Sequence, residues 1–596
     1  YRKAVRAFAD ALAETPHMLA ICRCAPDRQR TALYPLIDLL QRWLAWDDVP
    51  PLADRVKRLE QLVQEAQLEP QTSVALLASL LALPLPEERY TPLQLSPQQQ
   101  RQRIIETLVA LLLAVTAQHP VVLVVEDLHW SDPSTLDFLG LLVDQGPTAP
   151  LLTLLTCRPE FQPPWFGREH LTSLTLNRLL PAQVEVMIRT IPGAEALPAT
   201  VVQHLVARTD GVPLFVEELT KWVLESRSLP EPGPQSGHGN RTAAIPIPAT
   251  LHDFLMARLD RLGGAKRTAQ LLATVGREAA LRLLQAVSPL AEDLLRQDLQ
   301  QLVRTELLYQ RGVGPQATYV FKHALIQDAA YQSLVRSTRQ QYHERIACVL
   351  AEQYPEVVMV RPELVAQHYT EAGWAAEAIA YWQQAGEYAI QHSANLEAIS
   401  HLTQGLEVLA TLPETTERAQ HELTLSVTLG APLLMLHGYA AAEVARVYSR
   451  VQQLCAQVED TPEVFSALYG MCLFYLVRGD CQRALQVGEQ ALLLAQKLHE
   501  PDCILLANVL LGVTLYFCGE FATALVHLAQ GHARYDPARH HALAFRYGDD
   551  PGVFCLAYMT VALWMLGYPD QAHMRSRAAV ALARQLGHPF SLAIPL

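Results

Sequence analysis

The sequence predicts an α/β domain built on a parallel sheet, followed by an all-helical region and then by a solenoid of helical repeats. Three observations support this architecture. Apolar strand-like runs alternate with amphipathic helices in the first part of the chain, a segment rich in Pro, Gly and Ser follows, and a helix-ending glycine motif recurs towards the end. This order of patterns is typical of a multidomain α/β and α-helical protein.

Three apolar runs predict the strands of the sheet. They are Met18–Cys24, Val121–Val125 and Leu151–Thr156. Strands that are apolar along their whole length belong to sheets covered on both faces, which is the rule for parallel sheets.

Amphipathic segments between these runs predict helices. The segments are Tyr34–Trp46, Asp54–Ala66, Gln100–Gln118 and Thr135–Asp144. Strands that alternate with helices in this way indicate crossover connections and therefore parallel strand pairing.

The segment Ser228–Asn240 reads SLPEPGPQSGHGN and predicts a linker, which we extend to residues 228–246. Short amphipathic helices then fill residues 247–340. Glu306–Tyr309 and Thr318–Phe321 are candidates for a small hairpin among them. Helices combined with a hairpin indicate a winged helix-turn-helix region.

Residues 341–596 carry helix after helix, with a recurring turn that begins at Gly373, Gly479, Gly519 and Gly567. Each of these glycines is followed five residues later by Ala. A glycine can end one helix in the left-handed conformation, and the alanine lets the next helix pack closely. The last two intervals, 40 and 48 residues by subtraction, exceed the ~34 of standard tetratricopeptide repeats (TPRs). A TPR-like solenoid with longer helices fits, and an irregular helical bundle is the alternative.

Composition excludes several classes of protein. Hydrophobic residues make up 50% of the 596 residues and charged residues 18%, as in folded proteins. The formal net charge of −13 argues against a general affinity for nucleic acid. The longest apolar run, around Leu108–Val115, is far shorter than the ~18 residues of a membrane helix. Ten cysteines without any CxxC spacing indicate a reduced, cytoplasmic protein.

The stretch VVLVVEDLHWSDPST carries the candidate chemistry. An apolar strand followed by Glu126 and Asp127 has the form of a Walker B motif. Ligands of such sheets bind at the carboxyl ends of the strands. There one carboxylate can hold Mg²⁺ through water and the next can orient or deprotonate an attacking water. We assign the metal role to Glu126 and the base role to Asp127. A one-residue shift of these roles, or a strand that simply ends in solvated charges, is the alternative.

Four segments in order, EDLHWSDPST, TCRPEF, TDGVPLFVEEL and FKHALIQDAAY, resemble the STAND class of signalling ATPases. The closest resemblance is to bacterial predicted ATPases fused to class III adenylate/guanylate cyclase domains, and it covers essentially the whole chain. It implies an AAA/STAND ATPase domain over residues 1–227, with a helical lid at about 180–227. It also implies ATP and Mg²⁺ as cofactors.

The resemblance implies further site residues. Thr156 and Arg158 match the position where the family's sensor group reaches the γ-phosphate, although they could simply end a strand. Gly211 and Pro213 match a GxP element near the adenine, and an ordinary interhelical loop is the alternative. His323 matches a histidine that some relatives place against the β-phosphate, and a structural role is the alternative.

The sequence lacks the phosphate loop GxxxxGK[ST] that a site of this class also needs. Relatives run from that loop into a helix and then into a CxP…ALYP segment. Ala4–Leu12 matches the helix, and Cys24-Ala25-Pro26 and Ala32–Pro35 match the segment. We therefore expect Tyr1 to fall just after the Walker lysine. Both ends look truncated, and the chain as given should bind ATP poorly.

We expect a nucleotide-dependent regulatory module, in which ATP and ADP alternate in the parent protein. The repeats would sense a protein or a small inducer, and an effector such as a cyclase would lie outside the chain. The parent would hydrolyse ATP slowly, while the chain itself would be inactive. The alternatives are a transcription regulator of the maltose-activator class, against which the acidic stretch Glu292–Leu302 argues, and an interaction scaffold.

Overall fold

The computed structural model describes residues 17–46, 51–86, 89–90, 97–195, 197–227, 250–438, 441–458, 460–540 and 550–586, together with the single residues 8, 11, 93, 95 and 543. The chain forms two compact units, residues 1–165 with 350–596 and residues 166–349. Most of the predicted helix Ala4–Leu12 and the linker at 228–246 lie outside the described residues.

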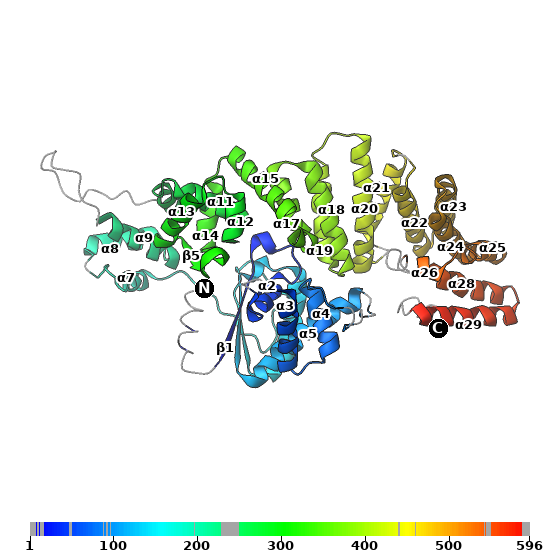
Figure 1. The fold of residues 1–596 in the computed structure, drawn as a ribbon, viewed down its shortest axis with the longest axis horizontal. Helices are drawn as coiled ribbons and strands as arrows, with labels where there is room; N and C mark the ends of the chain where they lie inside the picture. The colour runs from blue at the N-terminus through cyan, green and yellow to red at the C-terminus, as the bar shows by residue number, and fades with distance from the viewer. Residues whose placement is uncertain are drawn as a thin grey trace. The chain divides into compact units, whose positions relative to one another are not determined.

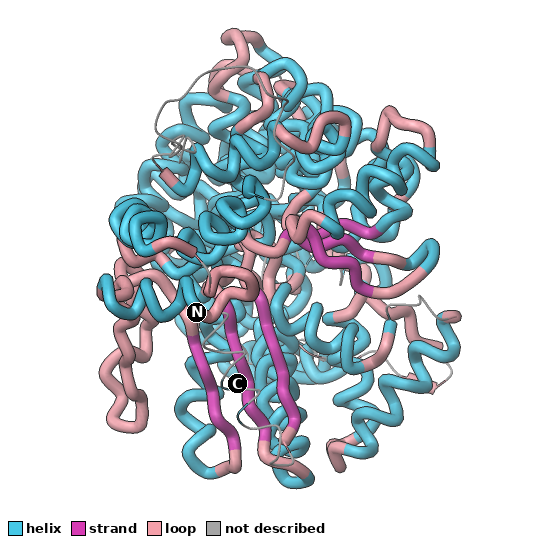
Figure 2. The backbone as a smooth tube through the Cα atoms, turned by 90° about the vertical axis from the view of Figure 1, so that its left-hand side faces the viewer, coloured by secondary structure: helices cyan, strands magenta, loops and turns pink. Residues whose placement is uncertain are grey.

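A parallel three-stranded sheet organises the first part of the first unit (Figure 2). Its strands are β1 (Met18–Arg23), β2 (Val121–Glu126) and β3 (Leu151–Leu155), in the order β1-β2-β3. Met18 pairs with Val121, and Val121 pairs with Leu151. The three strands predicted from the apolar runs are confirmed, and all six residues of the central strand β2 are buried.

Helices pack around this sheet and share one core with it. They are α2 (Tyr34–Trp43), α3 (Leu52–Glu65), α4 (Pro70–Leu80), α5 (Pro97–Gln118) and α6 (Pro133–Gln145). Four of them confirm predicted helices within three residues at each end. The helix α4 was not predicted, because its sequence PQTSVALLASL reads as a short apolar run without clear helical periodicity.

The rest of the first unit is a TPR-like array of helices, drawn in Figure 1 as consecutive antiparallel pairs. The helices are α16 (Pro355–Val360), α17 (Pro362–Ala372), α18 (Ala375–Gln391), α19 (Asn395–Leu409), α20 (Thr416–His437), α21 (Ala442–Cys455), α22 (Pro462–Val477), α23 (Cys481–Leu498), α24 (Pro501–Phe517), α25 (Phe521–His532), α26 (Pro537–His540), α28 (Pro551–Met565) and α29 (Pro569–Leu586).

The recurring turns of this array adopt the backbone expected of them. Gly373, Gly479, Gly519 and Gly567 have φ values of 85°, 77°, 85° and 86°. The alanines five residues further on are at most 2% exposed. Glycine is needed at these turns because the left-handed conformation is costly for other residues. The predicted pattern, a glycine that ends one helix and a buried alanine five residues later in the next helix, is therefore confirmed.

The first helices of the second unit are α7 (Pro181–Arg189), α8 (Ala199–Thr209) and α9 (Pro213–Arg227), which lie in the range where the sequence analysis expected a helical lid. These helices share one hydrophobic core with the helices that follow the linker. Those are α10 (Leu251–Asp260), α11 (Ala265–Val275), α12 (Leu281–Val287), α13 (Glu292–Arg304) and α14 (Ala324–Gln332). The helix α15 (Arg336–Gln353) follows them in the chain.

A small antiparallel sheet of order β4-β6-β5 completes the second unit. Its strands are β4 (Glu278–Ala280), β5 (Leu308–Arg311) and β6 (Thr318–Phe321). The predicted hairpin is therefore confirmed, although its first strand starts two residues later than expected. Within the described part of the chain, no helix is both long enough and apolar enough to cross a membrane.

Candidate functional site

Glu126 and Asp127 lie at the carboxyl end of the central strand. Glu126 is the last residue of β2, between the ends of β1 and β3, and Asp127 follows it directly. Asp127 takes the left-handed conformation, with φ 59° and ψ 43°. A short polar residue tolerates this backbone better than most. The sharp turn ends the strand, so the acid pair stands at the edge where parallel sheets bind ligands.

Glu126 forms an ion pair with Arg23 of the neighbouring strand. The two residues are Cα partners in the parallel register, and Arg23 Nε donates to Glu126 Oε2 over 3.1 Å. Glu126 is 7% exposed, so its charge is costly to bury without a partner. Arg23 therefore compensates the carboxylate and fixes its orientation.

Thr156 holds the backbone of the acid pair in place. Its Oγ1 accepts a hydrogen bond from the Asp127 amide at 3.0 Å, and its carbonyl accepts one from the Leu128 amide at 2.8 Å. Asp127 and Thr156 directly follow the neighbouring strands β2 and β3. The sequence did not predict that the threonine acts on the backbone of the loop.

Arg158 lies beside the same loop. Its guanidinium stacks over the ring of Trp130 at 5.2 Å, and the ring of His129 lies 4.4 Å from that of Trp130. Both ring nitrogens of His129 are buried without a hydrogen-bond partner among the described residues. Burial lowers the pKa of His129, and the charge of Arg158 lowers it further. His129 is thus held neutral, while the exposed Arg158 carries the positive charge of the cluster.

The acid pair matches what Mg²⁺ requires from a protein. Mg²⁺ usually takes one or two carboxylates and completes its shell with water and substrate phosphates. Glu126 and Asp127 supply two adjacent carboxylates, and within the described ranges no group of three or more His, Cys, Asp or Glu side chains forms a metal cage. Since Arg23 holds Oε2 of Glu126, water-mediated binding suits this carboxylate better than full direct ligation.

Gly211, Pro213 and His323 belong to the second unit, which we describe by itself. Gly211 has φ +66°, and a Cβ there would lie 2.3 Å from the carbonyl oxygen of Leu179. Its own carbonyl accepts from the Leu179 amide at 2.8 Å. Pro213 is the first residue of α9, where a missing N–H costs nothing. His323 is the N-cap residue of α14, two residues after the end of β6.

The structure adds residues that the sequence analysis missed at the start of α6. Asp132 is the N-cap residue of this helix and is 1% exposed. It accepts hydrogen bonds from the amide and hydroxyl of Thr135 at 2.8 and 2.6 Å. Burial raises the pKa of Asp132 to about 7, and the nearby carboxylate of Glu397 adds to the rise. The pattern Asp-Pro-Ser-Thr was a readable capping signal for this helix.

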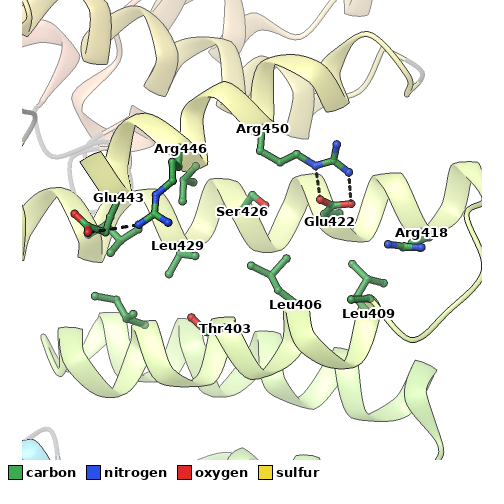
Figure 3. A pocket seen from close by; sticks show the side chains of 14 residues that line it. Thr403, Leu406, Leu409, Arg418, Glu422, Ser426, Leu429, Glu443, Arg446 and Arg450 are labelled. Atoms are coloured by element: carbon green, nitrogen blue, oxygen red, sulfur yellow. Dashed lines mark hydrogen bonds and ion pairs between the residues drawn. The ribbon is translucent and has the colours of Figure 1, made fainter. Parts of the chain in front are cut away.

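A groove of about 520 Å³ opens in the repeat array (Figure 3). Leu406 of α19 faces Leu429 of α20 across an apolar floor. Arg450 binds Glu422 through two hydrogen bonds at the rim, of 2.5 and 2.8 Å. Arg418 also lines the groove and donates to the carbonyl of Leu412 at 2.8 Å. The groove thus combines an apolar floor with a rim of three arginines and two glutamates, in which Arg446 pairs with Glu443 and Arg450 with Glu422.

Residues 3–154 match the family model described as AAA ATPase domain. The matched segment contains β1, β2 and most of β3, together with Glu126 and Asp127. The chain is also 25% identical over 508 residues to an uncharacterized protein of Rhizobium meliloti (strain 1021), with 83% of the chain and 48% of that protein covered. The chain therefore spans about half the length of this curated relative.

Solved structures give weaker likenesses. One is a STAND protein with a tetratricopeptide repeat sensor from Pyrococcus horikoshii, with a TM-score of 0.34, 10% identity, and 100% of this chain and 84% of that chain covered. A Rap protein complexed with Competence and Sporulation Factor gives 0.30 at 11% identity, with 57% and 79% covered. NprR in complex with its cognate peptide NprX gives 0.29 at 11%, with 52% and 80% covered. Scores of this size support no conclusion about function.

Proposed function

We propose that this chain is part of a STAND-type signalling ATPase, a switch that couples the nucleotide state of an AAA domain to a TPR-like sensor array. The effector, such as an adenylate/guanylate cyclase, would lie outside the chain. The observation that carries the proposal is the acid pair at the carboxyl end of the central parallel strand, inside the segment that matches an AAA ATPase domain. All ten cysteines are free, which favours the cytoplasm as its compartment.

In this proposal Glu126 holds Mg²⁺ through water, with Arg23 fixing its carboxylate. Asp127 orients or deprotonates the attacking water. Bound Mg²⁺ would supply charge neutralisation between the phosphates. Thr156 positions the amide of Asp127, and the exposed Arg158 is available to a phosphate oxygen, for which its planar fork is suited.

We propose that three further residues contact the nucleotide. Gly211 and Pro213 would form the turn near the adenine, and His323 would face the β-phosphate. The domain limits also stay proposals, with the ATPase domain at 1–227, the linker at 228–246, a winged-helix region at 247–340 and the repeats at 341–596. The order α11-β4-α12-α13-β5-β6 supports the winged-helix name.

The groove of the repeat array is where we place the sensed protein or small inducer. Its apolar floor suits an apolar ligand, and its rim carries three arginines against two glutamates. Anilinonaphthalene sulfonate, an apolar dye with a single negative charge, is therefore a suitable probe. We expect the native chain to enhance the fluorescence of the dye. Leu406→Lys should abolish the enhancement, while Leu493→Lys, which changes a leucine that is 66% exposed elsewhere on the array, should not. Equal fluorescence of both variants would refute this placement.

ATP turnover tests the proposal as a whole. The measurement uses a protein in which a GxxxxGK[ST] phosphate loop precedes this chain. We expect slow Mg²⁺-dependent hydrolysis, which Asp127→Asn lowers by about 10²–10⁴-fold while ATP still binds. Glu106→Gln, at a solvent-facing position of α5, serves as the control. Hydrolysis that survives Asp127→Asn would refute the catalytic assignment, and a protein that binds no ATP would leave an interaction scaffold.

A transcription regulator of the maltose-activator class is the second candidate, because the second unit contains helices combined with a hairpin. The helix expected to read DNA, α13, begins with two acids, Glu292 and Asp293, and so offers few phosphate contacts. A mobility shift with random duplex DNA at low salt separates the two candidates. The switch predicts no shift, and a salt-sensitive shift would favour the regulator.

A further inference from the structure

The loop that carries Asp127 is anchored at two points. At its start, the amides of Asp127 and Leu128 donate to Thr156. At its end, the loop enters α6 at Pro133. The first turn of α6 has backbone amides without helical partners and carries the partial positive charge of a helix N-terminus.

Glu397 of the repeat helix α19 binds this helix N-terminus. Its Oε1 accepts a hydrogen bond from the Ser134 amide at 3.0 Å and another from the Ser134 hydroxyl at 2.7 Å. Glu397 is 2% exposed and Ser134 is 1% exposed. A repeat residue therefore binds an amide that lies seven positions after Asp127.

A second repeat carboxylate binds the neighbouring segment. Glu363, in the first turn of α17, accepts a hydrogen bond from the Thr31 hydroxyl, and both residues are buried. Two positions after Thr31, the Leu33 amide donates to Asp132 Oδ1 at 2.8 Å. The two carboxylates from the array thus bind on either side of the Leu33–Asp132 hydrogen bond, at Thr31 and at Ser134.

A buried carboxylate is tolerated only when it is well hydrogen-bonded, so this contact is sensitive to geometry. A small movement of α19 would break both bonds to Ser134. It would leave a buried amide and a buried charge without partners. Movement of the array is therefore coupled energetically to the start of α6.

We propose that Glu397 is a positioning residue, through which the repeat array holds the loop that carries Asp127. The inference rests on the proposed function, because the loop matters only if Asp127 acts on nucleotide. It extends that function by naming the contact through which a movement of the repeat array would change the position of the loop that follows β2. In this mechanism, a ligand that shifts α19 releases the start of α6 and changes the position of Asp127.

Hydrogen exchange of the chain itself tests the contact without any nucleotide. Three variants are compared with the wild type: Glu397→Ala, Glu397→Gln and the control Glu387→Ala. Glu387 is exposed on α18 and accepts a hydrogen bond from Gln383. In Glu397→Ala we expect the amides of the first turn of α6 to exchange about tenfold faster or more. In Glu397→Gln they should stay near the wild type, because the amide oxygen of Gln accepts the same two bonds.

The exchange of β2 amides reports whether the variant is folded as a whole. Faster exchange confined to the first turn of α6 supports the contact. Unchanged exchange there in Glu397→Ala refutes it, and so does an equal change in Glu387→Ala. If Glu397→Ala unfolds globally, Glu397→Gln carries the test, since exchange in it as fast as in the unfolded chain would refute the hydrogen-bonding role.

Turnover of the longer, phosphate-loop-containing protein tests the coupling. We expect Glu397→Ala to change kcat for ATP at least about fivefold with little change in KM, and Glu397→Gln to restore it. If Asp127→Asn retains full turnover, the catalytic assignment of Asp127 fails while the exchange result stands. If Asp127→Asn abolishes turnover and Glu397→Ala leaves kcat unchanged, the coupling inference fails by itself.

Discussion

Arg23 donates from Nε to Oε2 of Glu126 over 3.1 Å, so the last residues of two neighbouring parallel strands share one ion pair. Glu126 is nearly buried, whereas the Arg23 side chain is 30% exposed. The pair sits at the edge of the sheet where we place the nucleotide, and it links the stability of the sheet to the orientation of the proposed metal-binding carboxylate.

Removal of the arginine should destabilise the sheet. Arg23→Ala removes the guanidinium that pairs with the nearly buried carboxylate of Glu126, so we expect the free energy of unfolding to fall by about 1–3 kcal/mol. Urea unfolding measures the change. Arg103→Ala is the control, because its contact with Glu106 spans 3.8 Å at an exposed site and should cost less than about 0.5 kcal/mol. Equal losses for the two variants would contradict the role of the pair.

The buried Asp132 should make stability depend on pH. Its pKa is raised to about 7 by burial and by Glu397, against ~3.9 for a free aspartate. The folded chain therefore binds this proton more tightly than the unfolded chain. Stability from this group is fully present below about pH 4 and is lost as pH rises through about 7.

Asp132→Asn should flatten that part of the stability profile, because Asn stays neutral while its oxygen can still accept from Leu33 and Thr135. The measurement is urea unfolding at a series of pH values between 4 and 8. A slope that is the same in the wild type and in Asp132→Asn would show that other groups set the pH dependence.

Gly211 should be far less tolerant of a side chain than Gly263. A Cβ at Gly211 would meet the Leu179 carbonyl at 2.3 Å, whereas one at Gly263 meets nothing within 4 Å. Both positions have positive φ, so an alanine at either one costs about 1–2 kcal/mol for the left-handed backbone conformation. We expect Gly211→Ala to cost about 1–3 kcal/mol more than Gly263→Ala in urea unfolding. Indistinguishable midpoints for the two variants would count against the close approach.

The packing of α24 against α25 should depend on Gly512. A Cβ there would lie 2.6 Å from Leu528 Cγ, so Gly512→Ala should destabilise the array by about 1–3 kcal/mol. Leu528→Ala removes the clashing group. The double variant should therefore lose less stability than the sum of the two single variants. Strict additivity in thermal unfolding would contradict the contact.

The chain as given should not bind ATP at low micromolar concentration, because its sequence contains no GxxxxGK[ST] motif to hold the phosphates. Titration with a fluorescent ATP analogue and Mg²⁺ measures this. Saturable binding in the low micromolar range would overturn the expectation.

Much of the fold could be predicted from local patterns. The strand β2 is apolar up to its last residue, Glu126, which is typical of a strand covered on both faces. The glycines of the repeats adopt a backbone conformation that few other residues adopt. Both features can therefore be recognised from a few consecutive residues. The helix α4 escaped prediction because it lacks a clear period. It begins after Glu69, whose carboxylate accepts from the amides of Gln71 and Thr72.

The sequence predicted the two acidic residues of the candidate site, but it did not predict which residues bind them. The sequence marked Glu126 and Asp127 because an apolar strand ends in them. It gave no sign that Arg23 would pair with Glu126, since strand register is set by tertiary packing.

The sequence by itself determined which segments are strands and helices and where the acid pair falls, because these depend on periodicity, turn chemistry and burial within short windows. Only the tertiary structure decided that Glu397 binds the amide of Ser134, 263 positions away. A buried carboxylate needs donors of a particular geometry, and no local pattern records which distant amide will supply them.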